Sequence, residues 1–398
     1  MLQPIADADL QLDALESSPF VAAMCLNLRV LKKASRTNFR LFRKPLNTSF
    51  HFQQASRTFI QSKQVCGDVT HSPDREWISE KLSLLAEHAD DLVDIEPSET
   101  NNYRPLTALK LIVLSVGVDV FSRIVPQRYE HTYCFDLFAG AGATTIDGFD
   151  DTAVVGSPVL APVMTHQDFD KYHFVEIEEN KAKALRRRLD FMESKIDFPR
   201  QKCEVHCENS NEFVHDLLDN IRNDIGGYEG FNMFSFIDPE GLDPRWDVTR
   251  RIADLFGDLL IHYPETAVNR DKETQKASRY FPDNSFQDCG TEERRKQVYC
   301  DGLEARRNTD ITVPVRIDSG ETGKNYHYDL IYATRETESG APYVAAMESM
   351  QRKIQLLDGD DVRRVFKCLR GEQAALESFV GDVSETNDSA GQQSFENY

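Results

Sequence analysis

Apolar side chains in the central part of the chain follow two alternating patterns. Short apolar runs are separated by longer segments in which apolar residues recur every three to four positions. This alternation predicts βαβ units, and therefore a mostly parallel sheet with helices on both faces. The expected strands are Tyr133–Phe138, His173–Ile177, Cys203–Cys207, Phe231–Ile237, Asp258–Tyr263, Val313–Ile317 and Tyr328–Thr334.

Two segments ahead of the first strand show helical spacing. The first runs from about Trp77 to His88, with Ser72 or Asp74 as a capping residue, and the second runs from Leu106 to Val125 and ends before Pro126. At the other end, a turn-rich stretch at 319–324 separates the last two strands and predicts an antiparallel hairpin. We therefore expect an α/β fold with a C-terminal antiparallel hairpin, the Rossmann-like arrangement of class I methyltransferases.

The pattern also divides the chain. Residues 1–75 are mildly basic and lack a sustained period, which indicates a poorly ordered or variable extension. Residues 76–370 form the predicted Rossmann-type domain, in which 265–310 is an insertion expected to cover the substrate side. Residues 371–398 are polar and poor in apolar side chains, as is typical of a disordered tail.

Composition narrows the setting in which the protein works. The formal net charge is −20, with 66 acidic and 46 basic residues spread along the chain, so a halophilic source is a hypothesis and nucleic acid is disfavoured as a partner. No apolar run approaches the ~20 residues of a membrane span, and no secretion signal is visible, which favours the cytoplasm. Eight scattered cysteines in no CxxC pair predict no metal site, and His166, His173 and His206 receive no role.

The first chemical signal is a small-residue turn directly after the first predicted strand, DLFAGAG at 136–142. Gly140 and Gly142 let the backbone bend tightly and approach a ligand without an intervening Cβ. Asp136 could orient this loop or accept a hydrogen bond from a ligand ammonium group. We predict that Asp136, Phe138, Gly140 and Gly142 contribute to a cofactor site, although a tight turn alone would look the same.

The second signal is an acid at the end of the next strand. Glu176 could accept hydrogen bonds from both ribose hydroxyls of a nucleoside cofactor, with Glu178 as the fallback; either could instead be an acid favoured by a helix N-terminus. Glu176 follows the glycine turn by about 35 residues, more than the ~20 of the dinucleotide fingerprint, which favours a methyltransferase over a dehydrogenase. Asn209 is expected to recognise adenine, unless Asn209 or Ser210 simply caps a helix.

The third signal is FIDPEG at 236–241, where a strand delivers an acid and a proline to the carboxyl edge of the sheet. Ligands of open α/β sheets bind at that edge. We predict Asp238 as the substrate-facing acid or base and Pro239 as the residue that fixes the neighbouring backbone, against the alternative of a simple Asp-Pro turn. Basic clusters at 186–188 and 294–296 are interpreted as solvated helix faces.

With these elements in place, the chain resembles the three-Cys-motif partner proteins. The matching passages are DLFAGAG at 136–142, FVEIE at 174–178, FIDPEG at 236–241 with Trp246, DLLIHYPETAVNR at 258–270 and YDLIYATR at 328–335. The resemblance implies a methyltransferase fold, S-adenosylmethionine as cofactor and a three-Cys-motif protein as partner. By motif position, it also places Arg270 and Tyr263 on the substrate side.

One departure affects the expected chemistry. Amino-methyltransferases that act on bases usually follow the Asp-Pro pair with a second proline and an aromatic residue, whereas Glu240 and Gly241 stand here. This weakens the case for methylation of adenine or cytosine and leaves the acceptor open. The main hypothesis is a methyltransferase; the alternatives are a non-catalytic cofactor-binding partner module and, third, a nicotinamide-dependent dehydrogenase.

Overall fold

The computed structural model describes residues 86–103, 106–146, 152–307, 312–318 and 327–334. The predicted N-terminal extension, most of the first expected helix and the predicted polar tail lie outside these residues. Ahead of the main sheet, the structure has the helices α5 (Ala89–Ile95) and α6 (Leu106–Ile124), with a single turn, η1 (Pro97–Glu99), and the short strand β1 (Asn101–Tyr103) between them. The helix predicted from Leu106 to Val125 is thus confirmed to within one residue.

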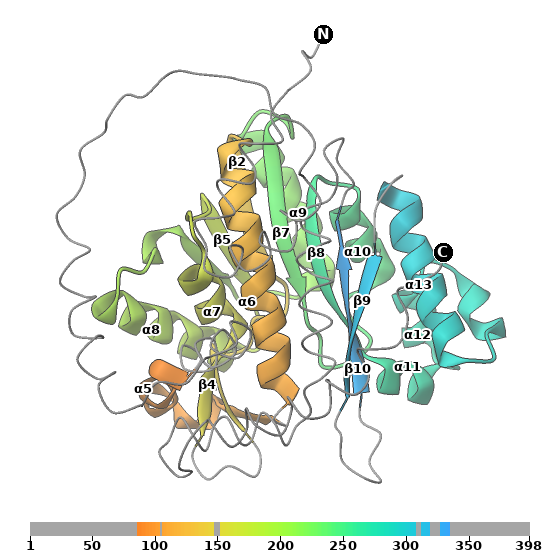
Figure 1. Ribbon diagram of the computed structural model, residues 1–398, viewed down its shortest axis with the longest axis horizontal. Coiled ribbons are helices and arrows are strands. Elements are labelled where there is room, and N and C mark those ends of the chain that lie inside the picture. Colours follow the sequence, from red (N-terminus) through yellow and green to blue (C-terminus); the bar gives the residue numbers. More distant parts are fainter. Residues whose placement is uncertain (1–85, 104–105, 147–151, 308–311, 319–326, 335–398) are drawn as a thin grey trace, which may run out of the picture.

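A seven-stranded sheet forms the centre of the domain (Figure 1). Its order is β6-β5-β2-β7-β8-β10-β9, and all neighbours are parallel except β10, which runs antiparallel to both β8 and β9. The predicted strands and the C-terminal hairpin are confirmed, and the strand order defines the class I methyltransferase variant of the Rossmann fold. The strands are β2 (His131–Asp136), β5 (Lys171–Val175), β6 (Cys203–His206), β7 (Phe231–Ile237), β8 (Gly257–Tyr263), β9 (Thr312–Asp318) and β10 (His327–Ala333).

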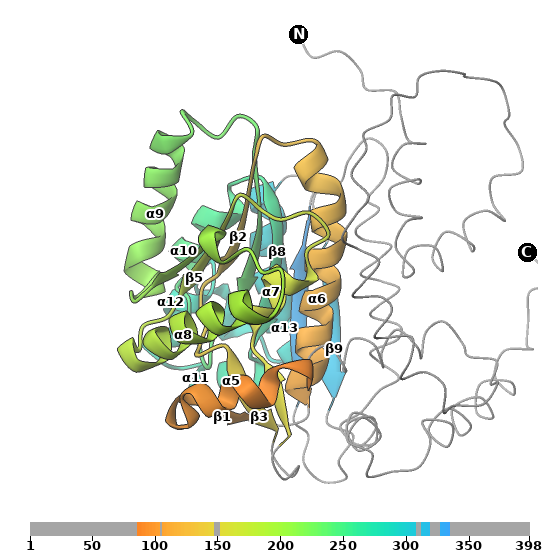
Figure 2. The same ribbon diagram turned by 90° about the vertical axis from the view of Figure 1, so that its left-hand side faces the viewer.

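Alternation along the central strands sends side chains into two separate cores. In β7, Phe234 and Phe236 enter the core on one face, whereas Met233 and Ile237 enter the core on the other. Because helices cover both faces, every residue of this strand is buried, which explains its continuous apolar run. The sheet separates α6, α7 (Ser157–Met164) and α8 (Glu179–Lys195) from α9 (Ser210–Asp224) and α10 (Trp246–Ala253) (Figure 2).

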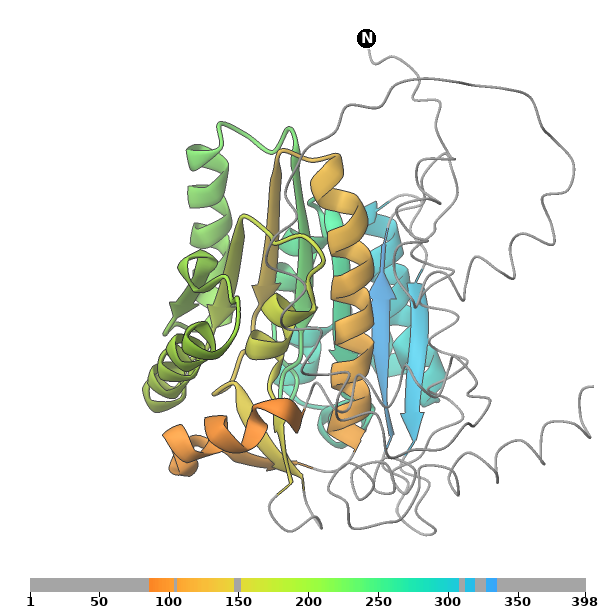
Figure 3. The same cartoon turned by 60° about the vertical axis from the view of Figure 1, so that its left-hand side comes forward.

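The chain does not pass directly from the glycine turn into a helix. It first forms a hairpin of β3 (Ala143–Ile146) and β4 (Ala153–Val155), and β1 pairs in parallel with β3 to make a small second sheet (Figure 3). The Gly156 amide then donates to the Gly142 carbonyl at 2.8 Å, and a Cβ on Gly156 would lie 2.9 Å from that residue's backbone. This close approach returns the chain to the glycine turn before α7 begins.

The segment from 265 to 307 forms the helices α11 (Glu265–Asp271), α12 (Gln275–Tyr280) and α13 (Glu292–Arg307), with a short turn, η4 (Asn284–Asp288). Tyr263 lies fully buried among the aromatic rings of this segment, including those of Tyr280 and Tyr299. The placement of Tyr263 on the substrate side is therefore wrong. Within the described part of the chain, no helix is both long enough and apolar enough to cross a bilayer.

Candidate cofactor site

A pocket of about 500 Å³ opens at the carboxyl edge of the sheet, over the ends of β2, β5 and β7. This is the volume of a typical small-molecule site, and it lies where the strand order reverses. The structure brings nearly all of the predicted residues to its wall: Phe138, Gly140, Gly142, Glu176, Asn209, Asp238, Pro239 and Arg270. Asp136 lies beneath the wall and is almost fully buried.

The two glycines of the turn have different roles. Both have positive φ angles, +61° at Gly140 and +85° at Gly142. A Cβ on Gly142 would lie 2.8 Å from the Leu185 side chain of α8, so any side chain here would disturb that packing. A Cβ on Gly140 would meet nothing within 4 Å, so this position faces the open pocket. Gly140 is therefore where a ligand can approach the backbone.

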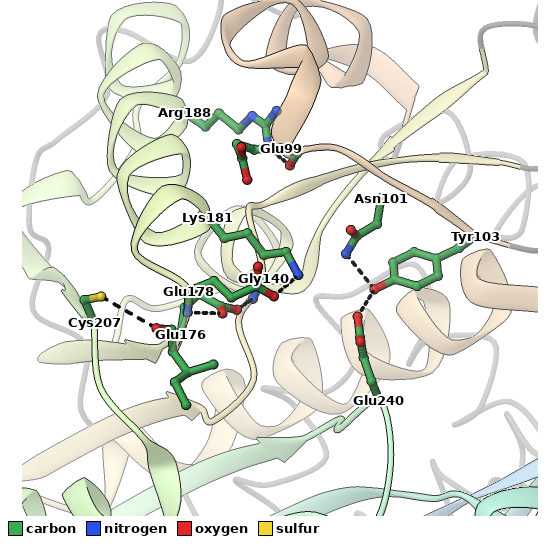
Figure 4. A network of polar contacts seen from close by, with 11 residues as sticks. Glu99, Asn101, Tyr103, Gly140, Glu176, Glu178, Lys181, Arg188, Cys207 and Glu240 are labelled. Atoms are coloured by element: carbon green, nitrogen blue, oxygen red, sulfur yellow. Dashed lines mark hydrogen bonds and ion pairs between the residues drawn. The ribbon is translucent and has the colours of Figure 1, made fainter.

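Glu176 ties the glycine turn to the loop after β5. Its Oε2 accepts from the Gly140 amide at 2.8 Å, and its Oε1 accepts from the Glu178 amide at 2.8 Å (Figure 4). Each carboxylate oxygen has a second lone pair, so acceptor capacity remains. The Glu178 side chain is instead largely exposed and lies 2.5 Å from the ammonium of Lys181. Both acids considered from the sequence line the pocket, and Glu176 is the one that also holds the glycine turn.

Asp136 holds the loop from below. Its Oδ1 accepts from the Phe138 amide at 3.2 Å, whereas its Oδ2 is buried without a hydrogen-bond partner among the described residues. Burial is the main reason that the pKa of Asp136 rises to about 7, with the charges of Asp238 and Glu176 adding to it. The Ser157 hydroxyl and the Phe138 amide oppose that rise.

This raised pKa predicts a specific pH dependence of stability. Between about pH 4 and pH 7, the folded state keeps a proton on Asp136 that the unfolded chain releases, so stability falls as pH rises through this window. We expect Asp136→Asn to remove this loss, so that the Tm of the variant gains on the wild type from pH 4 to pH 7 and the gap is constant above. Thermal melts at several pH values test this, with Asp190→Asn, a change of an exposed side chain on α8, as the control. A constant gap throughout would contradict the assignment.

The sequence left two interpretations of Asn209, adenine recognition and helix capping, and the structure shows that it caps a helix. It is the N-cap of α9, and its Oδ1 accepts from the Asn211 amide at 3.0 Å. The hydroxyl of Ser210 does not cap the helix. It donates to the Leu137 carbonyl at 2.5 Å, which fixes α9 against the glycine turn. Asn209 also lines the pocket, so the two interpretations are compatible.

Asp238 lies between two partners that sequence reasoning missed. Lys110 of α6 places Nζ 2.5 Å from Oδ2, and His262 of β8 places Nδ1 3.0 Å from Oδ1. Burial by itself would raise the pKa of Asp238, but the charge of Lys110 and the hydrogen bond from His262 outweigh it and hold that pKa well below its usual range. Asp238 is therefore a fixed anion and a weak base.

The strand β1 brings a further pair to the pocket. The hydroxyl of Tyr103 donates to Oε1 of Glu240 at 3.3 Å and accepts from Nδ2 of Asn101 at 2.8 Å (Figure 4). Burial, followed by the charges of Glu240 and Asp238, raises the pKa of Tyr103 well above its usual value. Glu240 occupies the place at which base-methylating enzymes carry a second proline. It ties the Asp-Pro loop to the small sheet, a contact between residues 137 positions apart.

Arg188 of α8 is fully buried, which corrects its interpretation as part of a solvated helix face. Burial lowers the pKa of this guanidinium to about 10. It makes no ion pair with a carboxylate within the described residues, and its donors are satisfied mainly by backbone oxygens at 2.7–3.3 Å. The acceptors are the carbonyls of Leu92, Glu96, Glu99 and Ala141 and the hydroxyl of Thr100. Arg188 thus connects the segment before β1 to the glycine turn.

Comparisons with known proteins give only distant similarities. No family model and no curated protein sequence matches the chain. Among solved structures, it is similar to a Legionella pneumophila protein of family DUF519, with a TM-score of 0.40 and 9% identity over 61% of this chain and 91% of that one. An O-methyltransferase from Bacillus cereus in complex with SAH matches with a TM-score of 0.33 and 12% identity, covering 71% of this chain and 97% of that one. An rRNA methylase from Streptococcus thermophilus matches with a TM-score of 0.28 and 13% identity, covering 54% of this chain and 93% of that one.

Proposed function

We propose that this protein is an S-adenosylmethionine-dependent methyltransferase. One observation carries the proposal: Glu176, at the end of the second strand of the sheet, is hydrogen-bonded to Gly140 at the wall of the pocket. An acid in this position accepts the ribose hydroxyls of nucleoside cofactors. The antiparallel C-terminal hairpin favours methyl transfer over hydride transfer as the chemistry of this sheet.

The residues present fit the cofactor. Gly140 leaves open space on the pocket side, and the carboxylate of Glu176 retains acceptor capacity for the ribose. Phe138 and Asn209 line the pocket and would contact the adenine ring, and acidic side chains at its wall would suit the positively charged methionine portion. Asp136 would act indirectly, by holding the Phe138 amide and thus the shape of the turn.

Bound S-adenosylmethionine would supply an electrophilic methyl group. The work of the protein would then be alignment of the acceptor, which can contribute several kcal/mol to catalysis. Asp238 is held rigidly by Lys110 and His262, and Pro239 restricts the backbone that follows it. Because the carboxylate of Asp238 is a weak base, its proposed role is to orient the acceptor by accepting a hydrogen bond, with little share in removing a proton.

The first experiment is a calorimetric titration with S-adenosylmethionine, S-adenosylhomocysteine and NADH at low and high salt. We expect binding of the first two with a Kd near 1 μM, which corresponds to about −8 kcal/mol, and no binding of NADH. Binding of NADH alone would support the dehydrogenase alternative. A folded sample that binds none of the three would overturn the proposal.

Membership of the three-Cys-motif partner family is part of the same proposal. Three of the motif passages that carry the resemblance, at 136–142, 174–178 and 236–241, meet at the pocket although they are spread over about 100 residues. A three-Cys-motif protein would then be the partner. Mixing the two purified proteins and measuring their association by sedimentation tests this point, and failure to associate would remove the partner without affecting the cofactor. The net charge of −20 continues to disfavour nucleic acid as the acceptor.

Both carboxylate oxygens of Asp238 already have partners, Lys110 and His262. This favours a second candidate, a non-catalytic module that binds cofactor and supports another enzyme. Asp238→Asn separates the two. An enzyme should lose methyl transfer by about 100-fold, the usual effect of a misplaced acceptor, with the Kd for S-adenosylmethionine close to the wild-type value. The assay follows label from methyl-tritiated cofactor into a cell extract. A module should show no Asp238-dependent transfer. Because Asp238→Asn leaves Lys110 unpaired, a Lys110→Met/Asp238→Asn double variant controls for lost stability.

A further inference from the structure

Two histidines and a glutamate converge at the edge of the main sheet, outside the pocket. Nδ1 of His173 lies 3.1 Å from Nε2 of His206, and Oε2 of Glu204 lies 3.5 Å from the first nitrogen and 3.9 Å from the second. Within the described residues, this is the cluster whose potential ligand atoms meet the distance condition for a shared metal ion. The three side chains therefore bring three potential ligand atoms within 4 Å of one another, with the two imidazole rings stacked at an interplanar angle of 27°.

Strand register explains why residues 33 positions apart meet. β5 and β6 are parallel neighbours, and His173 is paired with Glu204. His206 lies two residues beyond Glu204, so both project from the same face of the edge strand. The ring of His173 stacks on Phe135, and the ring of His206 packs against Phe213 of α9. These aromatic contacts hold both imidazoles in place without a metal.

We infer that His173, Glu204 and His206 form a binding site for a divalent transition metal, with zinc as the best match. Zinc bonds of about 2.0–2.2 Å at tetrahedral angles require ligand atoms about 3.3–3.6 Å apart. The separations here are 3.1, 3.5 and 3.9 Å, so binding needs the outer two to change by a few tenths of an ångström. Two imidazoles and one carboxylate are an established zinc ligand set that leaves a fourth position for water.

The surroundings of the ligands support binding and limit its strength. Lys171 pairs with Oε1 of Glu204, which leaves Oε2 facing the histidines. Glu204 and His206 are partly exposed, so an ion can enter from solvent. Metal bound at Nδ1 of His173 places the ring proton on Nε2, which is buried without a hydrogen-bond partner in the described part of the chain. The lack of this outer contact should weaken affinity by about 10- to 100-fold relative to a site that has it.

The role that follows is structural. None of the three residues lines the pocket, and they belong to β5 and to β6, which is the edge strand of the sheet and only four residues long. A metal ion would fasten this short edge strand to its neighbour. The His206 carbonyl also accepts from the Glu176 amide at 3.0 Å, so the fastened strand ends beside the proposed cofactor carboxylate. The inference does not depend on the proposed function.

The test is a zinc titration of the full chain, purified without a histidine tag and treated with chelator, followed by calorimetry and by the visible absorption of bound Co²⁺. We expect one ion per chain, tetrahedral Co²⁺ spectra and, at a hundredfold excess over Kd, a rise in Tm of about 5 °C. Glu204→Gln and His206→Gln alter partly exposed side chains and should fold. Each removes one of the three ligands and should weaken zinc binding by about 100-fold or more, the upper end of what loss of an outer contact alone costs.

Two controls make the outcome decisive. Lys202→Met removes an exposed lysine that pairs with Asp168 and not with the cluster, and His215→Ala removes a histidine outside the cluster. Both should bind zinc like the wild type. Equal zinc affinity of the wild type and Glu204→Gln, or no zinc binding by the folded wild type, would overturn the inference.

Discussion

Replacing Arg188 by methionine is expected to lower the free energy of unfolding by about 3–5 kcal/mol, because each buried carbonyl that loses its donor costs about 1–3 kcal/mol. Methionine keeps the apolar bulk of the side chain but provides no donors. The four backbone carbonyls that the guanidinium satisfies would then lose these donors in a largely dry environment. Urea denaturation followed by circular dichroism measures the change.

The neighbouring residue provides a matched control. Arg187 is half-exposed and pairs with Glu96 at the surface, so Arg187→Met should cost about 1 kcal/mol or less. Arg188→Lys should fall between the two, because an ammonium carries the charge but cannot span acceptors on both sides of the planar group. Equal stability of the Arg188→Met and Arg187→Met variants would show that the buried guanidinium does not hold this part of the fold.

Gly140→Asp should weaken binding of S-adenosylmethionine by about 100-fold or more, while the protein stays folded. A side chain at this position meets no neighbouring atom and must enter the pocket, where its carboxylate would lie near Glu176. Aspartate tolerates the positive φ of +61° better than most residues, so the backbone change is small. Calorimetry gives the affinity, and a thermal melt confirms folding.

Gly140→Asn separates the causes of that loss, because it fills the same space without charge. If repulsion between the new carboxylate and Glu176 contributes to the loss, the asparagine variant should bind S-adenosylmethionine more tightly than the aspartate variant. Gly142→Ala should instead lower the stability of the protein, because its Cβ would lie 2.8 Å from Leu185. Wild-type affinity in folded Gly140→Asp would refute the assignment of the turn as the cofactor cradle.

The sequence by itself determined the sheet and the candidate edge. Apolar runs bounded by turn residues give the strands, because a strand buried on both faces needs a continuous apolar run and signals itself locally. The signals of the glycine turn and of Glu176 are also local, because each follows its strand directly in the sequence. Parallel strands align their carboxyl ends, so these residues had to meet at one edge of the sheet.

Only the tertiary structure decided which side chains those residues meet. Lys110 and His262 reach Asp238 from a helix and a strand on either side of it in the sequence, and Tyr103 reaches Glu240 from the small sheet. Arg188 looked like any charged helix residue until packing enclosed it. The partners of a buried charge are set by which elements pack together, and local patterns of polarity carry no information about contacts across such separations in sequence.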